Sequence, residues 1–197
     1  MAGLQLQKLI EKRLEIMDIE LNKIIGSACM NYSGIKYSDM INGKGVRVSL
    51  FVSGCTHKCK GCFNRDTWDP EYGNPFTEKE KNEIFDYFTK YGCVASGLSL
   101  LGGDPTYYKN IDTLIELLKE FKERFPGKDI WIWSGFTWEQ LVEDKKRFEL
   151  ISLCDVLIDG RFVLEKKDLK LKWRGSSNQR VIDVQKTIAG KNIVFYE

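Results

Sequence analysis

The chain has 197 residues, 43% of them hydrophobic, which is enough for one domain with a sizeable core, with or without an appendage. Its 30 lysines and arginines against 28 aspartates and glutamates give a formal net charge of +2, so charge gives no reason to expect nucleic acid as the main partner. No apolar stretch reaches eighteen residues and the charged N-terminus does not resemble a secretory signal, so we expect a cytoplasmic protein with no membrane partner.

The first 29 residues differ from the rest of the chain. Five apolar residues recur there at alternating steps of four and three: Ile10, Leu14, Met17, Leu21 and Ile24. This spacing predicts an amphipathic helix, although about two heptads are fewer than a coiled coil needs. We expect residues 1–29 to be an N-terminal helical extension that is dispensable for chemistry. It is either a helix lying on the body of the protein or a segment added ahead of Met30.

Residues 30–197 are predicted to form one α/β domain. β-Branched and aromatic runs predict strands over residues 46–52, 97–105, 129–135 and 155–160. Helix starts are indicated by two capping boxes, Thr77 with Glu80 and Thr137 with Gln140, and a further apolar helix ends near Pro126. Strands that alternate with helices indicate a parallel sheet covered by helices.

The predicted strands end in small or polar residues. These ends are Gly54–Cys55, Gly102–Gly103–Asp104, Ser134–Gly135 and Asp159–Gly160. In parallel α/β folds, ligands bind at the carboxyl ends of the strands. We therefore expect the functional site at this edge of the sheet.

Cys55, Cys59 and Cys62 follow the first predicted strand with the spacing C-x₃-C-x₂-C. A closed structural zinc or iron–sulfur site normally takes four protein ligands. Three thiolates leave one position of a 4Fe–4S cluster open for another ligand, so we predict that these cysteines hold such a cluster. The other cysteines, Cys29, Cys93 and Cys154, are interpreted as structural thiols.

An alternative is a zinc-stabilised binding module in which His57 completes a Cys₃His site. His57 is the only histidine of the chain and lies two residues from both Cys55 and Cys59, a spacing that strains chelation by all three. We therefore interpret His57 as a solvated loop residue. The module would be colourless, whereas an iron–sulfur protein absorbs visible light.

The cysteine motif and the sequence "LGGDP" resemble the radical S-adenosylmethionine enzymes. The resemblance implies a partial, open parallel (β/α) barrel. It also implies that S-adenosylmethionine binds the free iron and is cleaved to a 5′-deoxyadenosyl radical, with Gly102, Gly103 and Asp104 contacting its amino group. Many members have an aromatic residue just before the third cysteine, where this chain has Gly61. The Gly61 backbone and Phe63, which flank Cys62, are the candidates to hold the adenine.

Longer stretches are similar to one family, the activating proteins of anaerobic (class III) ribonucleotide reductase. They are "INGKGVRVSLFVSGC", "CKGCFNRDTW", "KDIWIWSGF", "DVLIDGRF" and "WRGSSNQR", in that order between residues 41 and 180. The resemblance implies hydrogen abstraction from a C-terminal glycine of the large reductase subunit, with reduced flavodoxin or a similar one-electron donor. Two alternatives are a pyruvate formate-lyase-type activase and a small enzyme of deazapurine synthesis.

The segment from Arg161 to Arg180 holds seven lysines and arginines but only two acidic residues. Such a run of charge is typical of a solvated face. A functional alternative is that this basic C-terminal tail docks on the reductase, with Trp173 as an anchor.

Overall fold

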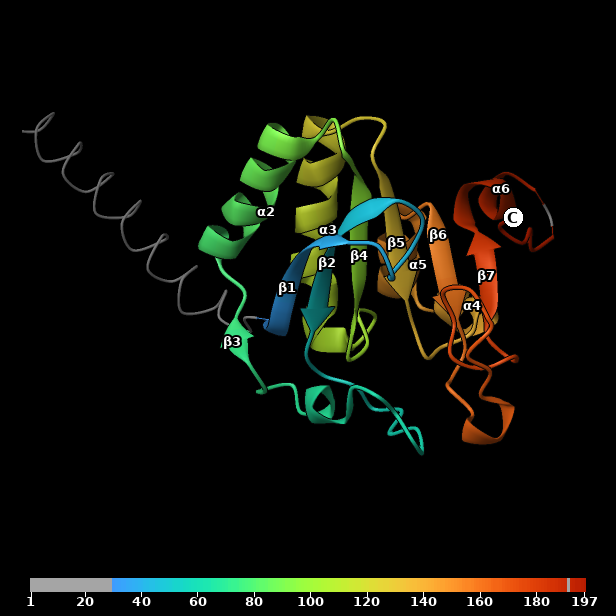
Figure 1. The fold of residues 1–197 in the computed structure, drawn as a ribbon. Helices are drawn as coiled ribbons and strands as arrows, with labels where there is room; N and C mark the ends of the chain where they lie inside the picture. The colour runs from blue at the N-terminus through green and yellow to red at the C-terminus, as the bar shows by residue number, and fades with distance from the viewer. Residues whose placement is uncertain (1–29, 191) are drawn as a thin grey trace, which may run out of the picture.

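The structure is a computed structural model that describes residues 30–190 and 192–197 (Figure 1). The predicted N-terminal helical extension lies outside the described residues. The fold is α/β and is built around one seven-stranded sheet.

The strands stand in the order β3-β1-β2-β4-β5-β6-β7. Their bounds are β1 Asn31–Asp39, β2 Val46–Val52, β3 Asn74–Pro75, β4 Ala95–Gly102, β5 Asp129–Trp133, β6 Val156–Asp159 and β7 Arg180–Asp183. The four strands predicted from sequence are β2, β4, β5 and β6, and they pair in parallel as expected.

The prediction of a parallel sheet was wrong at the edges, where β1, β3 and β7 pair antiparallel. A parallel connection needs a crossover, usually a helix, whereas antiparallel neighbours need only a short turn. The β1–β2 turn spans residues 40–45, which leaves no room for a crossover helix. β7 returns beside β6 after a segment that holds only the short 3₁₀ helix Leu164–Lys166.

Five α-helices are described: α2 Glu78–Tyr91, α3 Tyr108–Arg124, α4 Trp138–Glu143, α5 Lys145–Ser152 and α6 Val184–Ala189. Both predicted capping boxes are present, at the starts of α2 and α4. The helix predicted after Thr137 is interrupted at Asp144, whose side chain accepts from the Arg147 amide and starts α5. Within the described part of the chain, none of the helices has the length and apolar character that a membrane crossing requires.

The two faces of the sheet are covered differently because successive strand residues point to opposite sides. Val48, Leu50, Leu98 and Ile132 face the main core with apolar residues of α2, α3 and α5. On the other face, Trp131 packs with Val156, Ile158 and Val181. Arg47 is fully buried on that second face too, where it bonds to Ser99 and Asp129.

Two irregular segments lie at the carboxyl edge of the parallel strands. One follows β2 and carries the cysteines, and the other joins β6 to β7. In Figure 1 these are the teal and orange segments along the lower edge of the molecule.

A cysteine cavity at the carboxyl edge of the sheet

Cys55, Cys59 and Cys62 line one cavity of about 180 Å³, which we call the cysteine cavity. It also includes residues from the ends of β4, β5 and β6. Its other lining residues are His57, Asn64, Trp68, Leu101, Gly102, Gly103, Trp133, Ser134, Gly135, Gly160, Phe162 and Gln179. The structure thus brings the predicted cluster ligands and the glycine motif to one place, as the sequence predicted for the edge of the sheet.

Backbone hydrogen bonds connect the strand ends that form this cavity. The Gly103 amide donates to the Val52 carbonyl over 2.7 Å, and the Asp104 amide donates to the Gly54 carbonyl over 2.9 Å. A Cβ atom added at Gly103 would lie 2.6 Å from the Gly54 oxygen, closer than real Cβ atoms approach. A glycine is therefore required here so that the ends of β2 and β4 can meet.

The thiols of Cys55 and Cys59 lie in a setting that disfavours free thiolates. Burial, with a smaller contribution from the negative charge of Asp104, raises the pKa of Cys55 to about 11. Burial also raises the pKa of Cys59. In the metal-free protein these thiols therefore keep their protons at neutral pH, and metal binding has to release them.

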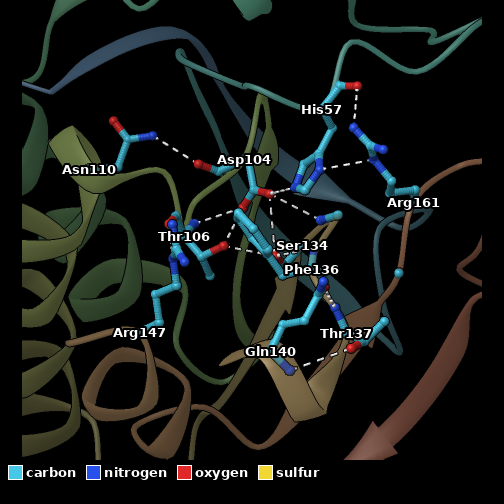
Figure 2. Close-up of polar contacts among 12 residues, drawn as sticks. His57, Asp104, Thr106, Asn110, Ser134, Phe136, Thr137, Gln140, Arg147 and Arg161 are labelled. Carbon is cyan, nitrogen blue, oxygen red and sulfur yellow. Dashed lines mark hydrogen bonds and ion pairs between the residues drawn. The ribbon is translucent and has the colours of Figure 1, made fainter. Parts of the chain in front are cut away.

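The interpretation of His57 as a solvated loop residue was wrong. Only 9% of its side chain is exposed, and both ring nitrogens have partners (Figure 2). Nε2 lies 2.9 Å from Oδ2 of Asp104, and Nδ1 accepts from Nε of Arg161 over 3.2 Å. Because Nδ1 accepts, Nε2 carries the proton and donates it to Asp104.

This arrangement bears on the zinc alternative. With Nδ1 accepting and Nε2 donating, the His57 ring has no lone pair left for a metal ion. Within residues 30–190 and 192–197, no three histidine, cysteine, aspartate or glutamate side chains are placed to share one ion. A four-iron cluster has a different requirement, since each thiolate binds a separate iron.

Asp104 accepts hydrogen bonds from three segments of the chain (Figure 2). Oδ1 accepts from the amide and hydroxyl of Thr106, and Oδ2 accepts from His57, from the Gly135 amide and from the Ser134 hydroxyl. The residue is 1% exposed and is not among those lining the cysteine cavity. Its carboxylate is thus occupied by the protein itself.

Other predicted cofactor residues are placed differently. Gly102, Gly103 and Cys62 line the cavity, whereas Gly61 and Phe63 do not. Phe63 is 99% exposed, and the Gly61 Cα lies close enough to Leu164 that an added Cβ would be 2.9 Å from it. Their assignment to the adenine stays a prediction.

Several lining residues were not singled out from the sequence. The side-chain Nδ2 of Asn64 donates to the Gly102 carbonyl over 3.1 Å and so connects the cysteine segment to the glycine motif. The Gln179 side chain accepts from the amides of Gly175 and Ser176 and donates to the Gly160 carbonyl. "WRGSSNQR" was noticed as a motif, but the spacing of its residues does not reveal this folded turn.

The basic tail contains arginines that bond to other residues of the domain and lysines that are exposed. Arg161 bonds to His57, and Arg180 pairs with Asp159 and Glu139. Four lysines are exposed, as a solvated face predicts: Lys166, Lys167, Lys170 and Lys172. Trp173 is half-buried, with its ring 4.9 Å from that of Trp131 and 6.0 Å from that of Tyr196. It therefore packs within the domain and is not a free anchor.

The remaining cysteines are consistent with structural thiols where they are described. Cys154 is fully buried, its sulfur faces the Leu150 carbonyl, and burial strongly raises its pKa. Cys93 is exposed in the turn after α2. Cys29 lies outside the described residues.

A buried donor on Trp68, one of the lining residues, indicates whether the cavity fits a cofactor. Nε1 of Trp68 is buried and finds no acceptor among the described residues. Buried polar groups without a partner are rare in native proteins, and each calls for an explanation such as a ligand. Three thiols on one cavity fit a bound cluster, and the unpaired donor of a lining residue fits a cofactor that presents acceptor atoms.

Comparisons with known proteins agree with this geometry. A family described as "4Fe-4S single cluster domain" matches residues 41–182. A protein of Escherichia coli strain K12 named anaerobic ribonucleoside-triphosphate reductase-activating protein is 41% identical over 152 residues, covering 77% of this chain and 97% of that protein. Proteins with the same name are similar at 42% identity in Pasteurella multocida, covering 76% of this chain and 95% of theirs, and at 44% in Enterobacteria phage T4, covering 77% and 93%.

Proposed function

The chain belongs to the family of anaerobic ribonucleoside-triphosphate reductase-activating proteins, and from that premise we propose that it is a radical S-adenosylmethionine enzyme that activates the reductase. The observation that carries the proposal is the meeting of Cys55, Cys59 and Cys62 with Gly102 and Gly103 around one cavity. The relatives reported above carry the name of the reductase-activating protein, which favours it over the pyruvate formate-lyase-type and deazapurine alternatives.

Two groups would supply the chemistry. When bound, a reduced 4Fe–4S cluster would supply the electron for reductive cleavage of S-adenosylmethionine to methionine and a 5′-deoxyadenosyl radical, and this radical would take hydrogen from a C-terminal glycine of the reductase. Cys55, Cys59 and Cys62 would hold three of the irons as thiolates.

The other lining residues would orient the cofactor and exclude water. The backbone at Gly102 and Gly103 lines the cavity, where its carbonyls would accept hydrogen bonds from the ammonium group of the cofactor. Asp104 is expected to support this backbone more than to bind the cofactor directly, since its oxygens are already taken. Trp68, one of the lining residues, would offer its buried and unpaired Nε1 as a donor.

The substrate is a protein backbone, so the site has to admit a peptide. We propose that the sheet is the open, partial barrel implied by the resemblance. In support, β3 and β7 end the sheet at opposite edges without pairing to each other. A gap between edge strands would leave access for the reductase loop, which a closed barrel would deny.

Docking of the reductase on the basic tail also stays a proposal. The structure changes how it should be tested, because truncating Trp173 would disturb its packing on Trp131 and Tyr196. Reversal of the exposed charges on Lys166, Lys167 and Lys170 leaves that packing intact. We expect such a variant to cleave S-adenosylmethionine normally but to activate the reductase less well, and normal activation would contradict docking. A reduced flavodoxin-like donor and a cytoplasmic location are likewise proposed.

The first experiment tests the radical chemistry. The protein is loaded with iron and sulfide under anaerobic conditions, reduced and mixed with S-adenosylmethionine, and 5′-deoxyadenosine and methionine are measured. We expect both products from the parent and none from Cys55→Ala, Cys59→Ala or Cys62→Ala. Cys93→Ala is the matched control, since Cys93 lies outside the cavity.

The second experiment identifies the partner. The loaded protein is incubated with the large subunit of anaerobic ribonucleotide reductase or with pyruvate formate-lyase, and the glycyl radical is recorded by electron paramagnetic resonance. A radical on the reductase alone is the expected result. A radical on pyruvate formate-lyase alone would overturn the assignment of the partner while leaving the chemistry intact.

A further inference from the structure

His57 is the one side chain of the cysteine loop that turns inward between two predicted cluster ligands. Its neighbours Thr56 and Lys58 are exposed, whereas 9% of the His57 side chain is exposed. Lys58 has a φ of 46°, in the left-handed region that side-chain-bearing residues seldom adopt. Such a backbone persists only where the surroundings enforce it, and strained residues of this kind cluster at functional sites.

The surroundings of the His57 ring are built to hold it. The His57 ring meets the Phe136 ring edge to face, with centroids 4.4 Å apart. The Arg147 guanidinium in turn lies 4.1 Å from the centroid of the Phe136 ring. A Cβ atom at Gly135 would lie 2.2 Å from Cδ2 of His57. The slot beside β5 thus accepts the imidazole only because residue 135 is a glycine.

Polar contacts fix the ring from both sides (Figure 2). On one side, Nε2 donates to the buried carboxylate of Asp104 over 2.9 Å. On the other side, Arg161 donates from Nε to Nδ1 over 3.2 Å and from Nη2 to the His57 carbonyl over 2.7 Å. The three side chains form a continuous chain of contacts, which we call the His57 interlock.

Each member of the interlock is next to a part of the cysteine cavity. His57 lies between Cys55 and Cys59, Asp104 follows Gly103, and Arg161 follows Gly160. Asp104 also accepts a hydrogen bond from the Gly135 amide, so these contacts join the ends of β4 and β5 as well. The contacts therefore connect the loop that would hold the cluster to the glycine motif that would hold the cofactor.

We propose that His57 is a positioning residue that, through Asp104 and Arg161, sets the cysteine loop relative to the glycine motif and so determines how S-adenosylmethionine meets the cluster. This inference rests on the proposed function and deepens it. His57 acts through other residues, because both of its nitrogens are engaged by protein groups and neither is free for substrate.

Three substitutions at this position separate the two halves of the interlock. His57→Ala removes both contacts. In His57→Gln the amide nitrogen can reach the place of Nε2 and donate to Asp104, whereas in His57→Asn the amide oxygen can replace Nδ1 and accept from Arg161. Lys60→Ala is the matched control, because Lys60 is exposed in the same loop.

The cluster-loaded proteins are compared by equilibrium binding of S-adenosylmethionine and by the electron paramagnetic resonance spectrum of the reduced cluster with and without it. We expect His57→Ala to load its cluster but to bind S-adenosylmethionine about tenfold more weakly and to lose the change in spectrum. His57→Gln should recover most of the affinity, because it keeps the buried contact with Asp104, and His57→Asn should recover less. A His57→Ala protein equal to Lys60→Ala in affinity and spectrum would overturn the proposal.

A second variant and a second measurement keep the proposal testable if the first experiment fails. If His57→Ala does not fold, Arg161→Ala, a change at an exposed residue, takes its place, and unaltered affinity there would overturn the part of the interlock that Arg161 forms. If the parent shows no spectral response to S-adenosylmethionine, the proposed function fails. The interlock is then judged by hydrogen exchange of the amides of residues 55–62, which should be faster in His57→Ala than in the parent; equal exchange would overturn it.

Discussion

Removing the indole N–H of Trp68 should stabilise the metal-free protein but weaken cofactor binding by the loaded protein. The indole Nε1 of Trp68 is buried in a residue of the cavity wall and finds no acceptor among the described residues. If this donor serves the cofactor, the metal-free protein bears the cost of leaving it unpaired, and the loaded protein gains a hydrogen bond. Removing the N–H while keeping the shape of the side chain separates these two effects.

The substitution that does so is Trp68→3-benzothienylalanine, introduced site-specifically, in which sulfur replaces the N–H and the bicyclic ring is kept. An unsatisfied buried donor costs about 1–3 kcal/mol, so we expect the metal-free variant to be more stable by about 1 kcal/mol. With a urea m-value of about 2 kcal/mol/M, the unfolding midpoint should rise by roughly 0.5 M.

The loaded variant should behave in the opposite way. Loss of one hydrogen bond worth about 1.4 kcal/mol weakens the binding of S-adenosylmethionine about tenfold. Urea unfolding of the metal-free protein and equilibrium binding to the loaded protein are the two assays. A variant that is less stable when empty, or that binds the cofactor as tightly as the parent, would refute the reasoning.

Three other perturbations follow from the structure. Gly135→Ala places a Cβ where the His57 ring lies, so this variant should show the weak cofactor binding of His57→Ala, measured by the same titration; normal binding would mean that the ring adjusts. Arg47→Met leaves the partly exposed Asp129 without its buried partner and should lower the free energy of unfolding by about 3 kcal/mol, checked by urea denaturation. Although burial opposes it, hydrogen bonds hold the pKa of Asp39 at about 2, so stability of about 2 kcal/mol, present above pH 4, should be lost as the pH falls from 4 to 2. Asp39→Asn should remove this slope, and an unchanged acid profile would contradict the assignment.

The features predicted correctly from the sequence depend on residues that are close together along the chain. A capping box joins Thr77 to Glu80, three residues on, and the same spacing recurs at Thr137. The C-x₃-C-x₂-C spacing confines three thiols to one loop, so their shared cavity follows from the sequence. The parallel centre of the sheet follows from the alternation of strands and helices, which is also a local pattern.

The errors concern partners that are distant in sequence. β1 had to be placed beside β2, and β7 beside β6, before their antiparallel direction could be known. The packing of Trp173, considered from sequence only as an alternative docking anchor, could not be foreseen because neither Trp131 nor Tyr196 is near it in the chain. Its packing is decided by the path of the segment between β6 and β7.

The sequence by itself determined the family, the grouping of the three cysteines and the edge of the sheet at which they lie, because motif spacing and strand endings encode these directly. Only the tertiary structure decided the contacts of His57. Its contacts reach Asp104, 47 residues away, and Arg161, 104 residues away, and no periodicity links such positions. A histidine between two cysteines is equally compatible with solvent, with a metal or with a buried carboxylate, and the fold selects the last by bringing the ends of β2, β4 and β5 together.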